Sequence, residues 1–205
     1  SEAGSAIASV LLGDVNPSGK LPFTFPVCLE DVGAHKLGEY PGVKRENENI
    51  WDAKYNEGIF VGYRWLDKEN IKPLFAFGHG LSYTDFLYYD AVLDKNTMGG
   101  NGKINVTAKV TNVGAVSGKE VVQLYISDEE CSVERPVMEL KGFKKVALEP
   151  GESKDVTFAI EPEMLKFYDA EKGEWTLEKG RFTVCIGSSS EDIRCKASFD
   201  YEEDR

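Results

Sequence analysis

Hydrophobic and polar residues alternate through the second half of the chain. Seven short runs rich in β-branched and aromatic residues succeed one another after residue 85, with turn-forming residues between them. The runs are FLYYDAVLD, KINVTAKV, EVVQLYIS, ELKGFKKVAL, DVTFAI, RFTVCIG and DIRCKASF. Every second position is apolar in four of them: Ile104, Val106, Ala108 and Val110; Val122, Leu124 and Ile126; Val156, Phe158 and Ile160; Phe182, Val184 and Ile186. This repeated period of two predicts a mainly β fold, an immunoglobulin-like β-sandwich over residues 86–205.

The first thirteen residues have a helical pattern instead. Ala3, Ile7, Val10 and Leu11 fall on one face of a 3.6-residue period. Gly13 follows at the position where helices commonly end with a glycine. We therefore expect a helix that presents a single apolar stripe.

Two short strands are expected after this helix. KLPFTFP, residues 20–26, alternates apolar side chains, and its prolines restrict it to the edge or end of a sheet. GIFVGYRWL, residues 58–66, has a β-rich composition. The apolar side expected for the second run comprises Ile59, Val61 and Tyr63.

A helix followed by strands is the element order of a layered α/β domain. These few elements cannot bury their own apolar faces, because an isolated pair of strands is marginally stable in water. We therefore expect residues 1–85 to be part of a larger α/β domain. The stripe at Ile7, Val10 and Leu11 is then exposed in this chain, which would aggregate or bind a partner.

The segment FGHGLSYTDF, residues 77–86, lies where the two patterns meet. No Ser or Cys nucleophile motif accompanies His79, and GHGLS differs from the G-x-S-x-G pattern of hydrolases. We expect His79 to make a hydrogen bond that holds a junction, while Gly78 and Gly80 supply unusual backbone angles.

The acidic composition narrows the classes of partner. The 205-residue chain has a formal net charge of −11, which disfavours binding to nucleic acid or to anionic membranes. No run reaches the roughly 18 apolar residues that span a bilayer.

The four cysteines show no metal-binding spacing, and we predict neither a metal nor a cofactor. Cys185 and Cys195 flank an expected hairpin, so a disulfide is an alternative to free buried thiols. The compartment stays undetermined, with this cysteine usage favouring a reducing cytoplasm over secretion or the periplasm.

Four carboxylates are candidates for paired acid–base chemistry of the kind that glycoside hydrolysis needs. They are Asp14, Asp52, Glu57 and Asp67. A structural role is favoured for each: Asp67 is expected to be exposed, and Glu57 to pair with Arg64. We predict no catalytic residue in the chain. Trp51 and Tyr55, in a long irregular loop, are the candidate substrate-binding residues, because sugar rings stack on aromatic faces.

Three segments resemble, in order and spacing, the C-terminal portion of glycoside hydrolase family 3, the β-glucosidases and β-xylosidases. They are AGSAIASVLLGDVNPSGKLPFTFP, YNEGIFVGYRWLD and PLFAFGHGLSYTDFLY. The later segments VTNVGAVSGKEVVQLYIS, PVMELKGFKKVALEPGE and GRFTVCIGSSSEDIR are similar to the fibronectin type III-like domain that follows in many members. The resemblance extends over nearly the whole chain.

The resemblance implies an exo-acting, retaining β-glycosidase, most often a β-glucosidase. Members carry an Asp nucleophile in a barrel domain and a Glu acid/base in an α/β sandwich, and neither motif has a match here. Residues 1–85 would be the C-terminal remnant of that α/β sandwich. The implied partners are the remainder of the enzyme, on the same or a separate polypeptide, and a β-linked gluco- or xylo-oligosaccharide. The chain alone would be inactive.

The alternatives from another class are a carbohydrate-binding module and a non-catalytic scaffold. Trp175, in KGEWTLEKG, is the natural candidate for a binding module, although we expect this tryptophan to lie in the core.

Overall fold

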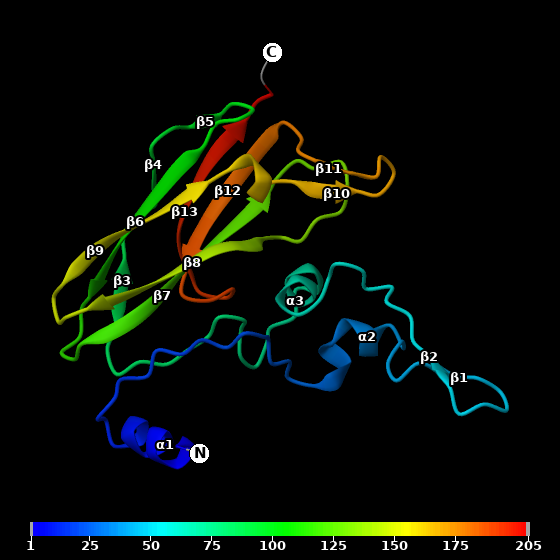
Figure 1. Ribbon diagram of the computed structural model, residues 1–205, viewed down its shortest axis with the longest axis horizontal. Coiled ribbons are helices and arrows are strands. Elements are labelled where there is room, and N and C mark those ends of the chain that lie inside the picture. Colours follow the sequence, from blue (N-terminus) through cyan, green and yellow to red (C-terminus); the bar gives the residue numbers. More distant parts are fainter. Residues whose placement is uncertain (1, 204–205) are drawn as a thin grey trace.

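The computed structural model describes residues 2–203. Residues 1, 204 and 205, which belong to the ranges predicted above, lie outside the described residues. Figure 1 shows two facing layers of strands in the C-terminal part, with the N-terminal helices on one side of them. The fold is mainly β, as predicted.

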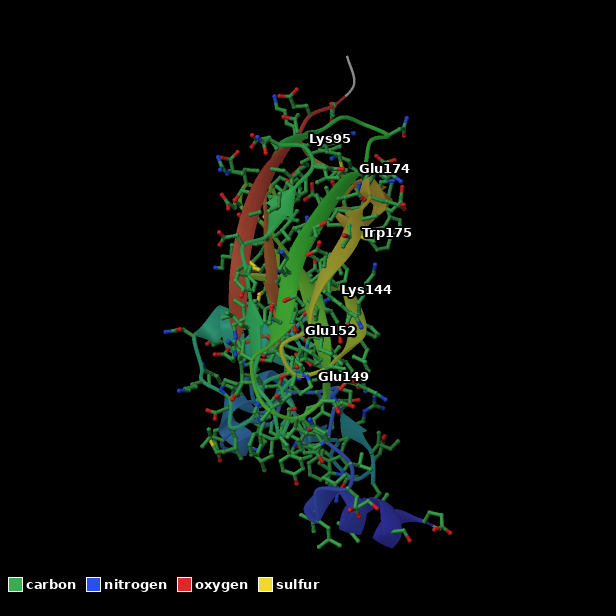
Figure 2. The ribbon with its side chains drawn as sticks, turned by 90° about the vertical axis from the view of Figure 1, so that its left-hand side faces the viewer. Lys95, Lys144, Glu149, Glu152, Glu174 and Trp175 are labelled. Carbon is green, nitrogen blue, oxygen red and sulfur yellow. The ribbon has the colours of Figure 1, made fainter. Side chains whose placement is uncertain are left out.

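The N-terminal segment, residues 2–85, contains little regular structure. Its elements are α1 (Ala3–Leu11), the 3₁₀ helix η1 (Leu29–Asp31), α2 (Gly33–Lys36), β1 (Val43–Lys44), β2 (Trp51–Asp52) and α3 (Tyr63–Glu69). The predicted first helix is confirmed as α1, which has no buried residue and protrudes from the rest of the molecule in Figure 2. Ile7 and Leu11 are exposed, as expected, whereas Val10 is partly buried.

The two strands predicted in this segment were largely wrong. Residues 58–66 form turns and the start of α3, because Gly58 and Gly62 adopt φ values of +57° and +64°, which an extended strand does not allow. Ile59 and Val61 are consequently exposed. In residues 20–26 only an isolated bridge from Phe25 to Phe75 is formed.

The sandwich, residues 86–203, contains the strands that alternation predicts. They are β3 (Phe86–Tyr88), β4 (Val92–Leu93), β5 (Thr97–Met98), β6 (Ile104–Asn112), β7 (Gly118–Asp128), β8 (Glu139–Leu148), β9 (Ser153–Ile160), β10 (Phe167–Asp169), β11 (Glu174–Thr176), β12 (Gly180–Gly187) and β13 (Ile193–Tyr201), with the 3₁₀ helix η2 at Pro162–Met164. One sheet has the order β5-β13-β12-β7-β8; in the other, β6 pairs with β3, β4 and β9. Apart from the parallel β5–β13 pair, the pairs within these two sheets are antiparallel.

The apolar residues predicted to face inward form the core of the sandwich. All thirteen alternating residues named from the sequence are buried between the sheets. Phe182 and Phe199 stack there with ring centroids 5.7 Å apart. Burial of this apolar surface is the main source of stability for the sandwich.

The β10–β11 hairpin was not predicted, and the expected burial of Trp175 was wrong. Trp175 is 66% exposed on β11 and contacts Tyr168 of β10 edge-on, with centroids 5.8 Å apart. Figure 2 shows Trp175 at the side of the sandwich, next to Glu174. In a three-residue strand pair only one face can turn toward the core, and Trp175 lies on the other.

Cys185 and Cys195 are free, buried thiols, which was the default expectation. Neighbouring positions of the β12–β13 pair place them on opposite faces of the sheet, Cys195 in the core and Cys185 in an outer cluster. A disulfide between them is therefore excluded by the strand register.

The outer cluster lies on the sheet face away from the core and joins the two parts of the chain. Tyr125, Met138 and Cys185 are buried there, and Tyr63 and Phe77 of the N-terminal segment pack against them. The outer face of β7 and β12 is thus covered by residues that lie far away in the sequence.

Candidate functional site

The loop that carries Trp51 and Tyr55 projects away from the sandwich as a small hairpin (Figure 1). Across its strand pair Arg45 donates two hydrogen bonds to Asp52, at 2.8 and 2.7 Å. At its base the buried Glu39 accepts hydrogen bonds from the backbone and the side-chain amide of Asn56. The loop is therefore held by contacts across its strands and at its base.

The side chains of both candidate substrate-binding residues of this loop are exposed to solvent. Trp51 is 51% exposed and Tyr55 is 79% exposed. Neither ring takes part in the aromatic contacts found among the described residues. Free aromatic faces on an anchored loop suit stacking against a sugar or another apolar surface.

The four candidate carboxylates lie in separate surroundings. Asp52 is engaged by Arg45, and Asp14 is exposed beyond α1. Glu57 borders a small hollow and Asp67 a different, larger groove. The structure does not present these four carboxylates as a pair flanking one site.

Two details of the carboxylate predictions were wrong. Glu57 does not pair with Arg64, since the Arg64 guanidinium lies 3.0 Å from Glu139 on β8 instead. Asp67 is partly buried, and one of its oxygens, Oδ2, is fully buried without a hydrogen-bond partner among the described residues.

Asp67 faces a groove of about 660 Å³ between α3 and the outer face of the sandwich. The titratable groups that line the groove are Asp67, Lys72, Glu129, Cys185, Glu191 and Lys196. Burial, with a further contribution from the negative charge of Glu191, raises the pKa of Asp67 to about 7. The groove therefore holds a carboxyl group that changes charge near neutral pH.

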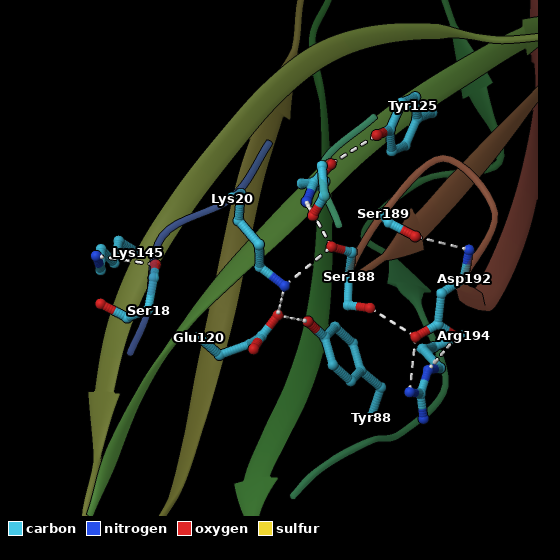
Figure 3. Close-up of polar contacts among 12 residues, drawn as sticks. Ser18, Lys20, Tyr88, Glu120, Tyr125, Lys145, Ser188, Ser189, Asp192 and Arg194 are labelled. Carbon is cyan, nitrogen blue, oxygen red and sulfur yellow. Dashed lines mark hydrogen bonds and ion pairs between the residues drawn. The ribbon is translucent and has the colours of Figure 1, made fainter. Parts of the chain in front are cut away.

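A second polar site joins the N-terminal segment to the sandwich, and Figure 3 shows its contacts. The Gln123 amide of β7 donates to the carbonyl oxygens of Gly78, at 3.1 Å, and Ser188, at 2.6 Å. Tyr125 donates in turn to the amide oxygen of Gln123, at 2.6 Å. Every polar atom of this buried amide is thus engaged, which fixes the position of residue 78 on the sheet.

A buried charge lies beside this amide. The Lys20 ammonium is 3.1 Å from the carboxylate of Glu120 and donates to the carbonyl of Ser188 at 3.1 Å. Tyr88 donates to the same carboxylate at 3.1 Å, and burial together with Glu120 raises the pKa of its phenol. These residues border a hollow of about 270 Å³ that also includes His79.

The junction is held by backbone as well as side-chain contacts. Gly78 has φ +79°, as expected, but Gly80 serves another purpose: it leaves room for the Gly19 carbonyl. The His79 carbonyl accepts a hydrogen bond from the backbone amide of Leu21 at 2.8 Å, and the His79 ring lies against that of Phe75. The segment is a fixed junction, and the hydrogen bond we expected from His79 is made by its backbone.

Sequence reasoning missed Gln123 and Glu120, although β7 carries a signal for Gln123. On a half-exposed sheet the outward positions are polar, yet Val121, Gln123 and Tyr125 are mixed in character. Such a strand indicates an outer face that another part of the chain covers. The identity of the covering segment is not contained in that pattern.

Both parts of the chain match known protein families. Residues 1–83 match the model of the glycosyl hydrolase family 3 C-terminal domain, and residues 120–190 match that of a fibronectin type III-like domain. The chain is 52% identical over 203 residues to the β-glucosidase BoGH3A of Bacteroides ovatus, a match of 98% of this chain and 26% of that protein. Thermostable β-glucosidase B of Acetivibrio thermocellus is 49% identical, over 95% of this chain and 25% of that protein.

Solved structures agree with these sequence matches. β-Glucosidase 3B from Thermotoga neapolitana, determined in complex with glucose, superposes with a TM-score of 0.85 at 38% identity, over 97% of this chain and 26% of that one. The chain belongs to glycosyl hydrolase family 3. It corresponds to the C-terminal part of the family 3 proteins and spans about a quarter of the length of these relatives. Within the described residues no helix is long and apolar enough to cross a membrane.

The packing at the junction predicts that replacing Gly78 by alanine lowers the free energy of unfolding. In Gly78→Ala the new methyl group overlaps the Gln123 amide, which its three hydrogen bonds hold in place. Gly173→Ala is the matched control, because Gly173 also has positive φ but no atom within 4 Å of the added carbon. We expect the control to lose about 1–2 kcal/mol of unfolding free energy and Gly78→Ala about 1–3 kcal/mol more. Urea unfolding measures both; equal losses would contradict the proposed packing.

The groove predicts a pH-dependent stability. The folded-state pKa of Asp67 lies above its usual value of 3.8. Protonated Asp67 therefore contributes to the stability of the folded state at low pH, and this contribution is lost as the pH rises toward 7. With allowance for partial exposure, we expect wild type to lose about 1 kcal/mol more than Asp67→Asn between pH 5.5 and 8. Urea unfolding of both proteins at the two pH values provides the measurement. The control Asp14→Asn should behave as wild type, and parallel pH profiles for wild type and Asp67→Asn would refute the assignment.

Proposed function

We propose that this chain is part of a retaining, exo-acting β-glycosidase that removes terminal non-reducing β-D-glucosyl residues. The observation that carries the proposal is the match of 98% of this chain, at 52% identity, to about a quarter of a β-glucosidase. The glucose named with the Thermotoga neapolitana structure supports a β-glucoside as the substrate class. The choice between glucosides and xylosides would depend on residues in the rest of the enzyme.

In this proposal the chemistry belongs to the remainder of the protein. Hydrolysis with retention needs two carboxyl groups about 5–5.5 Å apart, one acting as nucleophile and the other as acid and base. The carboxylates of this chain that we considered are not arranged in that way. Its role is structural, because it completes and supports the domains that carry the reacting groups.

We propose residues 1–85 as the part that completes the α/β sandwich and residues 86–205 as the fibronectin type III-like domain. The first strand of the sandwich begins at Phe86, and the two family models match on either side of this position. The sandwich supports the first part through the Gln123 junction and through α3, whose Tyr63 accepts a hydrogen bond from Leu140 on β8 at 2.9 Å.

Exposed apolar surface on the N-terminal segment favours a partner on that side. Large apolar side chains are exposed on α1, on the segment after it and near residue 75. They include Ile7, Leu11, Leu12, Phe23, Val27, Leu29, Leu74 and Phe75. A surface of this kind is typical of an interface. The partner we propose is the remainder of the same enzyme.

A chimera tests this function. The C-terminal quarter of BoGH3A is replaced by this chain, and hydrolysis of 4-nitrophenyl β-D-glucoside is compared with that of BoGH3A lacking the quarter. We expect the chimera to retain at least about a tenth of the BoGH3A rate, whereas the truncated enzyme and the isolated chain show no turnover. A monodisperse, folded chimera without activity would refute the proposed role.

The loop residues Trp51 and Tyr55 carry a separate prediction within the chimera. If these rings stack on the sugar, Trp51→Ala and Tyr55→Ala raise the KM for cellobiose about 3- to 10-fold with little change in kcat, because stacking is worth about 0.5–1.5 kcal/mol. Tyr89→Ala removes an exposed ring of the sandwich and serves as the control. Unchanged KM values in both loop variants would exclude a substrate contact.

A further inference from the structure

A hollow of about 280 Å³ lies in the N-terminal segment beside the start of α3. Its walls are mostly apolar and include Phe60, Trp65 and Val32. Trp65 is fixed, since its indole N–H donates to the Asp31 carbonyl at 3.1 Å and its ring packs against Gly33. One wall of the hollow is therefore an aromatic ring whose position is fixed.

Two polar atoms of the hollow lack partners. Oε2 of Glu57 and Oγ1 of Thr24 are buried, and neither makes a hydrogen bond within residues 2–203. A buried carboxylate oxygen without a hydrogen-bond donor is unfavourable, because it has lost its contacts with water and gained none in return. Both atoms can accept a hydrogen bond, so the hollow fits a group that donates more than one.

The nearby cations of this segment are engaged elsewhere. Arg64 pairs with Glu139 at 3.0 Å, and Lys68 pairs with Glu134 at 2.7 Å while covering the Phe60 ring. Lys36, whose ammonium lies over the Trp65 ring at 5.8 Å from its centroid, pairs with Glu69. The negative charge of Glu57 thus has no counter-charge among the ion pairs of the described residues.

We propose that the hollow receives an arginine side chain from the remainder of the enzyme, whose guanidinium binds Glu57 and Thr24. A guanidinium is planar, weakly hydrated and always charged, so it can lie against an aromatic wall and still donate to a carboxylate and a hydroxyl. The hollow belongs to residues 1–83, which match the family 3 domain model, and about three quarters of the relatives' length lies outside the match. This inference rests on the proposed function and names one contact through which the remainder of the enzyme docks.

The first test uses this chain and a small probe. Ethylguanidinium chloride is titrated into the 205-residue chain, and the NMR signal of the Trp65 indole N–H is followed, with sodium chloride at equal concentration as the reference. We expect a saturable shift caused by ethylguanidinium alone, weakened at least about 5-fold in Glu57→Gln and in Thr24→Val. Glu46→Gln, which removes an exposed carboxylate of the hairpin loop, should leave the shift unchanged. A shift of equal size in Glu57→Gln would overturn the proposal.

The second test identifies the natural occupant. A crystal structure of the BoGH3A chimera should show a guanidinium nitrogen about 2.7–3.2 Å from Oε2 of Glu57. A water molecule alone, a backbone N–H or a lysine in that position would overturn the assignment. An active chimera whose hollow lacks arginine would refute this contact and leave the proposed function intact. A folded but inactive chimera would refute the function.

Discussion

The arrangement of this chain depends on one constraint: the N-terminal segment has too small a core to hold its shape alone. Its buried apolar cluster consists of Phe60, Trp65 and Leu66, with Ile71 packed against it. The sandwich, in contrast, encloses a continuous core between two sheets. The segment therefore takes its position from the outer face of the sandwich.

Buried polar contacts make that attachment specific. An apolar surface alone would permit several alignments, because hydrophobic contact has no direction. The Gln123 amide allows only one, since leaving any of its donors or its acceptor unpaired would cost free energy. The Lys20–Glu120 pair and the Arg64–Glu139 pair are two further contacts between the segment and the sandwich. Together these contacts fix the position of the segment on the sandwich.

The N-terminal segment has several features that are typical of an interface. Exposed apolar side chains, the unpaired oxygen of Glu57 and the projecting hairpin all belong to residues 2–85. The sandwich shows fewer such features, its largest exposed aromatic residue being Trp175. This asymmetry agrees with a chain in which the sandwich supports and the N-terminal segment docks.

The sequence predicted those parts of the fold that local pattern decides. The sandwich strands and α1 follow from periods of two and 3.6, which neighbouring residues alone define. Residues 58–66 were predicted wrongly because β-branched and aromatic content outweighed two glycines, whose positive φ values end any strand. The exposure of Trp175 could not be predicted, because composition does not say which face of a short hairpin is covered.

The polar sites were beyond sequence reasoning because their partners are distant. Gln123 meets residues 45 and 65 positions away, and Asp67 is influenced by Glu191 across the groove. Element order and burial predicted that residues 1–85 are part of a larger α/β domain, and the family resemblance agreed with that prediction by implying the end of an α/β sandwich. It did not indicate which atoms of that segment would be left without partners.

Hydrogen–deuterium exchange tests the central claim most directly, that the sandwich supports a segment whose other side is completed by the remainder of the enzyme. The isolated chain is compared with the same residues in the BoGH3A chimera. We expect amides of residues 3–36 and 57–75 to gain at least about 10-fold protection in the chimera, while strands β6, β7 and β12 stay equally protected in both. Equal protection of the N-terminal segment in the two proteins would contradict the account.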